Sequence, residues 1–193
     1  MTKTYSKTRT LVECALMIAL GTVLANIKIY ELPNGGSVTL FSMLPFILIS
    51  FRHGVKWGLF TGFVNSLLQM LLGFYAPPAP GLLPLVGMIL LDYVLAFGVM
   101  GIAGLGRGKP HGIFWGSVLG GAARFVVHYI SGITIYKILA PTEIFGTVFD
   151  NPALYSLIYN GSYVGIDLVL CLVIFGILYA PLKTYMTGAD LRR

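Results

Sequence analysis

The stretch LPLVGMILLDYVLAFGVMGIAGL at residues 83–105 carries one charged side chain, Asp92, and is otherwise almost entirely apolar. A helix needs about 20 mostly apolar residues to cross the hydrocarbon core of a bilayer. The stretch is long enough for such a crossing. It therefore predicts a membrane-spanning helix that places a carboxyl group inside the membrane.

The whole chain has the composition of a membrane protein. Apolar residues make up 56% of its 193 positions and charged residues only 10%, and the mean hydropathy is +0.84. Soluble domains are about 25% charged, so this chain lacks the polar residues needed to coat a globule in water. Its length suits one compact domain, which we expect to comprise residues 1–193.

Apolar runs of helical length recur along the chain and are separated by turn residues such as those at 33–36. We interpret each run as one membrane-spanning helix. The first is interpreted as a span and not a cleaved signal, because the residues before it are polar and basic and no clean cleavage site follows. The runs, which together predict an all-α membrane protein with six transmembrane helices, are residues 11–29, 38–51, 57–74, 83–105, 112–138 and 155–179.

Positive charge alternates between successive connections. Since cytoplasmic loops carry the excess of lysine and arginine, the distribution predicts that both termini are cytoplasmic. The charges gather in no patch or tail, so the net charge of +6 does not predict a nucleic-acid partner. One side holds Lys3, Lys7, Arg9, Arg52, Lys56, Arg107, Lys109, Lys183, Arg192 and Arg193, and the other holds Lys28 and Lys137 with Glu31, Glu143 and Asp150.

Asp92 and its neighbour Tyr93 lie in the outer half of their run. Ionisable residues at bilayer depth are costly, and they usually line a cavity or pair with one another. The carboxyl group must therefore be protonated, paired with a cation or hydrated. One interpretation is a site for a cationic ligand beside an aromatic ring, and the other is a structural pair with Arg124 or His128.

The fifth run contains a stripe of polar and small residues. Arg124, His128, Gly132 and Tyr136 recur every four residues and so share one helix face. The glycine leaves room for a ligand or for a neighbouring helix. A packed contact between helices is the alternative to a binding site, and Arg124 could instead extend its charge to the cytoplasmic interface.

Two further features stand out in the last and first runs. Tyr155 opens the last run and Asn160 follows, and the amide of Asn160 needs partners for its donors and its acceptor. Tyrosines also commonly lie at membrane interfaces, which is the simpler interpretation of Tyr155. In the first run Ala15 and Ala19 have the small-xxx-small spacing that lets another helix approach closely, within the protein or outside it.

Motifs for chemistry are absent from the sequence. The two cysteines, Cys14 and Cys171, have no metal-binding spacing. The chain contains no Walker A loop, and neither H-E-x-x-H nor G-x-S-x-G. We therefore expect no catalytic residue, no metal and no cofactor, and any energy for transport must come from another protein.

Several segments, taken in order, resemble the thiamine-specific substrate-binding component (S component) of energy-coupling factor (ECF) transporters. The resemblance implies a six-helix protein of the bacterial plasma membrane. It also implies that the protein binds a vitamin outside and associates with a transmembrane coupling subunit and two ATPase subunits. The segments that carry the resemblance are residues 35–40, 50–58, 91–97, 128–132 and 155–161, with Pro45 between the first two.

The resemblance also implies roles for individual residues. Family members carry Glu where Asp92 stands and Trp where Tyr136 stands, and some carry Trp where Gly35 and Gly36 stand. Because Asp is one methylene shorter than Glu, a direct carboxylate contact with the ligand becomes longer or water-bridged here. On this basis the ligand-binding residues are Asp92, Tyr93, His128, Tyr136, Tyr155 and Asn160, to which the helix-face spacing adds Gly132. Ala15 and Ala19 match the pattern that meets the coupling subunit.

The residues and the resemblance lead to one preferred function. Thiamine carries a fixed thiazolium cation, a flat aminopyrimidine and a hydroxyl group, which suit a carboxylate, aromatic faces and a few polar side chains. The alternatives are an S component for riboflavin or a folate-like vitamin, a structural packing subunit without a ligand, and an intramembrane enzyme that uses Asp92, His128 and Arg124. We expect binding and release, and no bond chemistry.

Overall fold

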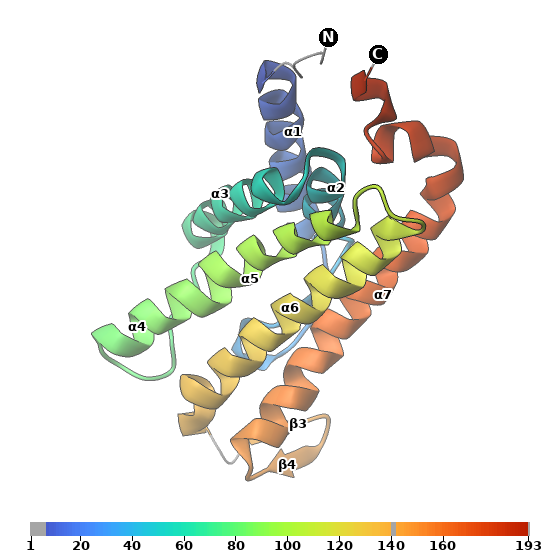
Figure 1. The fold of residues 1–193 in the computed structure, drawn as a ribbon. Coiled ribbons are helices and arrows are strands. Elements are labelled where there is room, and N and C mark those ends of the chain that lie inside the picture. Colours follow the sequence, from blue (N-terminus) through green and yellow to red (C-terminus); the bar gives the residue numbers. More distant parts are fainter. Residues whose placement is uncertain (1–6, 140–141, 193) are drawn as a thin grey trace.

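The protein is almost entirely helical, in a computed structural model that describes residues 7–139 and 142–192. Each predicted apolar run falls on a helical segment (Figure 1). Two short antiparallel hairpins lie in the connections, β1 with β2 and β3 with β4. The elements are α1 Lys7–Asn26, β1 Lys28–Glu31, η1 Pro33–Gly35, β2 Ser37–Thr39, α2 Leu44–His53, α3 Val55–Gly73, α4 Leu82–Met88, η2 Ile89–Leu95, α5 Ala96–Gly98, η3 Val99–Gly106, α6 Gly112–Thr134, η4 Tyr136–Leu139, β3 Thr142–Ile144, β4 Thr147–Phe149, α7 Pro152–Met186 and η5 Ala189–Arg192.

The stretch that contains Asp92 forms one continuous rod over Leu82–Gly106. The rod begins as α4, widens into the π-helix η2, returns to α-helix in α5 and narrows to the 3-10 helix η3. Asp92 lies in the middle of the π-helix. Single π-helical turns within helices are rare and are frequent at functional sites.

Glycines let the helices around this rod pack backbone against backbone. A side chain on Gly101 would place its Cβ 2.3 Å from the backbone nitrogen of Leu59 in α3. A Cβ on Gly62 would lie 2.3 Å from the carbonyl oxygen of Phe97. Small residues at such crossings are typical of helix packing in membranes, where close approach supplies the attraction. On its other side α6 lies between the rod and α7 (Figure 1).

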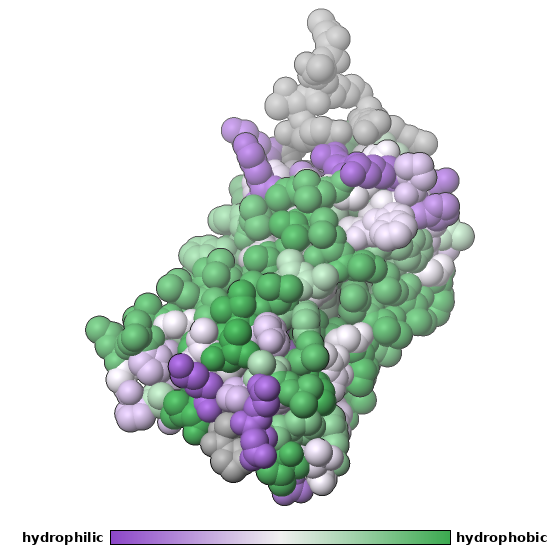
Figure 2. All heavy atoms as spheres, turned by 60° about the horizontal axis from the view of Figure 1, so that its bottom comes forward, coloured by the Kyte–Doolittle hydropathy of each residue, from purple (hydrophilic) through white to green (hydrophobic). Residues whose placement is uncertain are grey.

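The outer surface is apolar along the flanks of the helices. Figure 2 shows hydrophobic side chains over the flank, with hydrophilic ones near the two ends. Side chains such as Leu16, Trp115 and Ile177 are 62%, 71% and 64% exposed. The described part of the chain has four helices that are long and apolar enough to span a membrane, which are Lys7–Asn26, Leu82–Gly106, Gly112–Thr134 and Pro152–Leu191.

The two remaining helices do not meet the length and hydropathy of a span by themselves. The run predicted at 38–51 forms a helix of only 10 residues, about 15 Å long, because Val38 and Thr39 pair with β1. α3 has 19 residues, but polar residues such as Asn65 lower its hydropathy. The sequence therefore located six helical segments, while the structure supports four independent spans.

Other boundaries also differ from the prediction. The first run was predicted to continue to Ile29, but α1 ends at Asn26 and the chain turns into β1. The fifth run was predicted to reach Ile138, but α6 ends at Thr134. Tyr136 thus lies beyond the helix and not on its face. α7 extends the last run in both directions, with Asn151 accepting backbone hydrogen bonds at its start.

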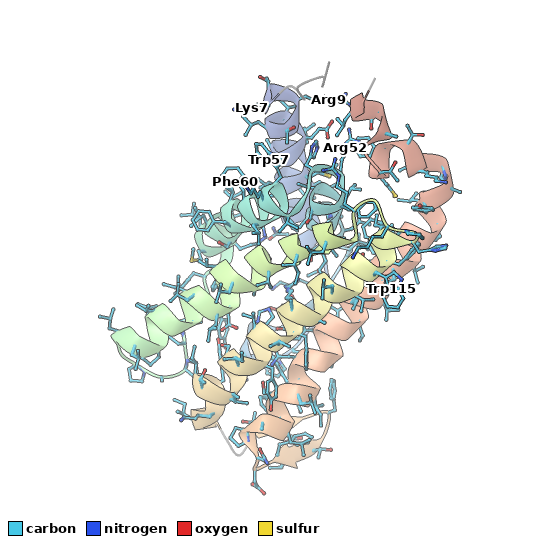
Figure 3. All side chains as sticks on the ribbon, viewed as in Figure 1. Lys7, Arg9, Arg52, Trp57, Phe60 and Trp115 are labelled. Atoms are coloured by element: carbon cyan, nitrogen blue, oxygen red, sulfur yellow. The ribbon has the colours of Figure 1, made fainter. Side chains whose placement is uncertain are left out.

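A cluster of charged side chains holds the helices together at the end of the molecule where α1 begins. Arg52 is fully buried, and its guanidinium binds Glu13 of α1 and Asp190 of η5 at 2.6 Å each. The same guanidinium lies over the ring of Tyr185, 3.9 Å from its centroid. Figure 3 shows Arg9 and Arg52 together at this end. Of the cations predicted on this side, Lys3 and Arg193 lie outside the described residues.

Candidate binding site

A cavity of about 380 Å³ lies at the opposite end of the bundle from Arg52. Helix ends and loops surround it: the end of α1, the segment 28–42, the end of α3, the rod, α6 and the start of α7. The volume is within the range of about 300–1,000 Å³ that small-molecule sites occupy. All seven predicted ligand-binding residues line it: Asp92, Tyr93, His128, Gly132, Tyr136, Tyr155 and Asn160.

Asp92 faces the cavity from the π-helical turn and binds two side chains of α6. One carboxylate oxygen lies 3.0 Å from Nδ1 of His128, and the other accepts a hydrogen bond of 2.6 Å from the hydroxyl of Ser131. The side chain of Asp92 remains 17% exposed. A carboxylate has about four lone-pair directions, so two remain for a group that enters the cavity.

Arg124 does not extend to the cytoplasmic interface. It is 9% exposed and lines the cavity. Its Nε–H donates to Nε2 of His128 at 3.4 Å, and its guanidinium lies 5.2 Å from the centroid of Phe97. Asp92 is therefore linked to Arg124 through the imidazole of His128. Among the described residues, no carboxylate oxygen lies within 4.0 Å of the Arg124 guanidinium, so Arg124 forms no ion pair there.

Tyr93 uses its hydroxyl to fix the backbone beside the cavity. The hydroxyl accepts a hydrogen bond of 2.9 Å from the backbone N–H of Tyr75 and donates to the carbonyl of Gly73. Its ring stacks on Phe74 with centroids 5.8 Å apart. Tyr93 thus orients the end of α3 and the loop after it, and offers the cavity its ring more than its hydroxyl.

Asn160 and Gly132 form a close contact between α6 and α7. The Asn160 amide donates to Ser156 at 2.9 Å and accepts from the hydroxyl of Tyr163 at 2.9 Å, so its polar atoms already have partners. A Cβ on Gly132 would lie 2.1 Å from the hydroxyl oxygen of Ser156. The glycine is therefore needed for the approach of the neighbouring helix, although it also lines the cavity.

A row of tyrosines on α7 holds the loop at residues 33–36 over the cavity. Tyr155 and Tyr159 stack with centroids 5.4 Å apart. The Tyr159 hydroxyl accepts from the backbone N–H of Gly36 at 2.8 Å and donates to the carbonyl of Pro33. The side chain of Asn34 donates to the hydroxyl of Tyr155 at 3.3 Å.

Sequence reasoning did not select Tyr159, Tyr163 or Ser131, which also line the cavity. Tyr159 and Tyr163 were attributable to an interfacial belt. Tyr155, Tyr159 and Tyr163 follow one another at intervals of four residues, which was the signal that could have placed them on one face. Nothing in the sequence distinguished Ser131, because its value depends on the register between α6 and the rod.

Comparison with known proteins gives the family. A family model described as Thiamine transporter protein (Thia_YuaJ) matches residues 11–186. The chain belongs to this thiamine transporter family. Thiamine transporter ThiT of Bacillus subtilis (strain 168) is 32% identical in an alignment of 188 residues that covers 88% of this chain and 89% of the relative. Thiamine transporter ThiT of Lacticaseibacillus paracasei is 30% identical in an alignment of 163 residues that covers 78% of this chain and 77% of the relative.

A solved structure shows the same fold. The structure of ThiT from Listeria monocytogenes matches with a TM-score of 0.76 at 22% identity, covering 93% of this chain and 98% of that chain. Membership of a thiamine transporter family confirms a multi-pass bacterial membrane protein. It also makes the intramembrane-enzyme interpretation wrong, because the family consists of transporters.

This thiamine transporter family member keeps Ala15 and Ala19 on an open surface. Both are exposed on α1, whereas Cys14 and Ile18 face inward and are buried. The exposed leucines Leu16 and Leu20 lie beside them. The small-xxx-small pair is thus not used for packing among the described helices.

Proposed function

We propose that the chain is the thiamine-binding S component of an ECF-type importer. Its residues 1–193 act as one substrate-binding domain that takes thiamine from outside the cell. A transmembrane coupling subunit and two ATPase subunits supply the energy. Binding needs no cofactor or metal, and the supporting observation is a carboxyl group, that of Asp92, with free acceptor positions in an aromatic-lined cavity.

The charged side chains at the cavity favour a cationic ligand. Asp167 lies behind the lining, where it is buried and accepts hydrogen bonds from the backbone and hydroxyl of Thr39 at 2.9 and 3.2 Å. Arg124 is directed to His128, so Asp92 is the charged group that keeps free hydrogen-bonding positions toward the cavity. At the mouth, Lys28 and Glu31 neutralise each other at 2.6 Å.

Aromatic rings complete the site for a flat cationic ligand. Tyr136 and Tyr155 line the same cavity as Asp92. A cation over such a ring gains about 0.5–2 kcal/mol. Burying a cation without a partner costs several kcal/mol, so the carboxylate would provide most of the selectivity. A folate-like ligand is anionic and would meet Asp92 unfavourably.

The positions of the loops support one arrangement in the membrane. A Cβ added to Gly54 would lie 3.7 Å from a guanidinium nitrogen of Arg107, and one added to Gly188 would lie 3.2 Å from the carbonyl oxygen of Arg52, so the cation-rich connections share one end. With that end cytoplasmic, the cavity opens outside. All six helical segments then cross the membrane, with the residues before α2 completing its short crossing and both termini in the cytoplasm.

A titration of the purified protein tests the ligand. We expect saturable binding of thiamine, with one site per chain, and no heat of binding with riboflavin or folate under the same conditions. Preferential binding of either other vitamin would overturn the assignment of thiamine. Failure to bind all three would support the structural-subunit alternative.

Uptake experiments test the coupling subunit. Ala15→Trp with Ala19→Trp places two large rings on the exposed face of α1, away from the cavity. We expect thiamine binding by the isolated protein to be unchanged and uptake by cells that hold the complete importer to be lost. The matched variant Val173→Trp changes an exposed position of α7 and should transport normally. Equal uptake by all three proteins would contradict docking through this face.

A further inference from the structure

Arg124 has no role in the proposed function so far, yet it places a charge deep within the bundle. Buried cations in membrane proteins are costly and are usually paired. Its contacts within the described residues are His128, the sulfur of Met100 at 3.9 Å and the ring of Phe97. Of these contacts, the hydrogen bond to the imidazole is the one that fixes where another polar group carries its proton.

The direction of this hydrogen bond determines the tautomer of His128. An arginine Nε–H can only donate, so Nε2 of His128 must be the acceptor. The ring proton is then on Nδ1, which lies 3.0 Å from Asp92. The imidazole donates to the carboxylate and is neutral. A second proton on Nε2 would face the positive guanidinium at 3.4 Å.

We propose that Arg124 is a positioning residue that keeps His128 neutral, so that Asp92 retains its charge for the cationic ligand. Without Arg124, the imidazole can accept a proton on Nε2 and become a cation beside Asp92. That cation would compete with the ligand for the same carboxylate. The inference rests on the proposed binding of thiamine and adds a residue that acts through His128 and not by contact with the ligand.

The other groups that face His128 do not replace Arg124. From η2 the ring faces Asp92, and from α7 it faces Tyr163, whose ring centroid is 5.8 Å away. The Tyr163 hydroxyl donates to Asn160, and the Asn160 amide reaches only the backbone carbonyl of His128, at 3.4 Å. Asp92 favours a protonated histidine and burial of the ring disfavours it. Among the charged groups described around the ring, Arg124 is the one that acts in the same direction as burial.

The pH dependence of binding tests this role. Thiamine affinity is measured by calorimetry at pH 8.0 and pH 5.5 for wild type, Arg124→Met and the exposed-cation control Lys109→Met. For wild type and the control we expect the same ratio between the two affinities. Arg124→Met should lose more affinity at pH 5.5 than these two proteins do. The upper limit is about tenfold, which corresponds to a histidine with the ordinary pKa of about 6.5, and burial of the ring makes the loss smaller. Protonation of thiamine itself cancels in the comparison.

Further variants separate this role from a merely structural one. The double variant Arg124→Met with His128→Gln should regain the wild-type ratio, because the titrating group is gone. Arg124→Lys keeps a positive charge at this position, so its ratio should lie between those of wild type and Arg124→Met. An Arg124→Met protein that binds with the wild-type ratio, or a pH effect that persists in the double variant, would overturn the inference.

A measurement on the wild type keeps the inference testable if Arg124→Met does not fold. The ¹⁵N spectrum of labelled histidine, assigned by comparison with His128→Gln, should show Nδ1 protonated and Nε2 bare from pH 5.5 to 8. A protonated Nε2 would refute the role of Arg124. This spectrum needs no ligand, so it also separates failure of the inference from failure of thiamine binding.

Discussion

Replacing Asp92 with asparagine changes the charge of the cavity with little change in shape. The carbonyl oxygen of the new side chain can still accept from His128, and the Ser131 hydroxyl can rotate to accept from the amide. The change therefore removes the charge and leaves the α6 contacts of the rod largely in place. It isolates what the carboxylate does for the ligand.

The magnitude follows from the geometry of the site. Two unit charges about 4 Å apart attract by about 4 kcal/mol at an effective dielectric constant of about 20. Loss of hydration offsets part of this, and hydrogen bonds to charged groups contribute about 1.5–3 kcal/mol net. Asp92→Asn should thus weaken thiamine binding by about 10- to 150-fold, and Asp92→Glu should bind more tightly than Asp92→Asn.

Titration calorimetry on thiamine-free protein in detergent measures this change. The matched control is Asp150→Asn, which neutralises an exposed aspartate outside the cavity and should bind like wild type. An analogue without the amino group and a neutral isostere of the thiazolium ring would show which positive part of the ligand Asp92 meets. An affinity of Asp92→Asn within threefold of wild type would refute the charge role.

Two other substitutions test contacts that stabilise the fold and the loop over the cavity. Arg52→Met leaves Glu13 and Asp190 without their buried partner, which costs about 3 kcal/mol or more. The Tm in detergent should therefore fall by several degrees, whereas Lys109→Met should not change it. An unchanged Tm for Arg52→Met would show that the ion cluster is not stabilising. Tyr159→Phe removes two hydrogen bonds to the loop at Pro33 and Gly36, each worth about 0.5–1.5 kcal/mol. In stopped-flow fluorescence, thiamine should dissociate from this variant several-fold faster than from wild type or from the exposed control Tyr30→Phe. Equal dissociation rates would mean that Tyr159 does not hold the loop closed.

Hydropathy was sufficient to find the helical segments but not their ends. The apolar run at 38–51 gave no sign that Val38 would pair with Tyr30 in a β-hairpin, since the pairing depends on how the loop folds back over the cavity. The run at 112–138 likewise did not show that α6 ends at Thr134. Apolar patterns are set by the lipid and not by the cavity, so they do not mark where helices stop at a site.

The candidate site could be predicted where a residue is unusual for its surroundings. Asp92 and His128 were identified because ionisable residues at bilayer depth need a reason, and the structure places both on one cavity. The π-helical turn that directs Asp92 inward could not be predicted, because it depends on packing against α3 and α6. The bridge that His128 makes between Asp92 and Arg124 could not be predicted either, since the contact with Asp92 requires the register between α6 and the rod.

A structure of the protein crystallised with thiamine tests the central proposal most directly. The ligand should lie in the cavity between Asp92 and the tyrosines of α7, with a positively charged or amino nitrogen within hydrogen-bonding or ion-pair distance of the Asp92 carboxylate. Thiamine bound elsewhere, or Asp92 turned away from the ligand to pair directly with Arg124, would contradict it.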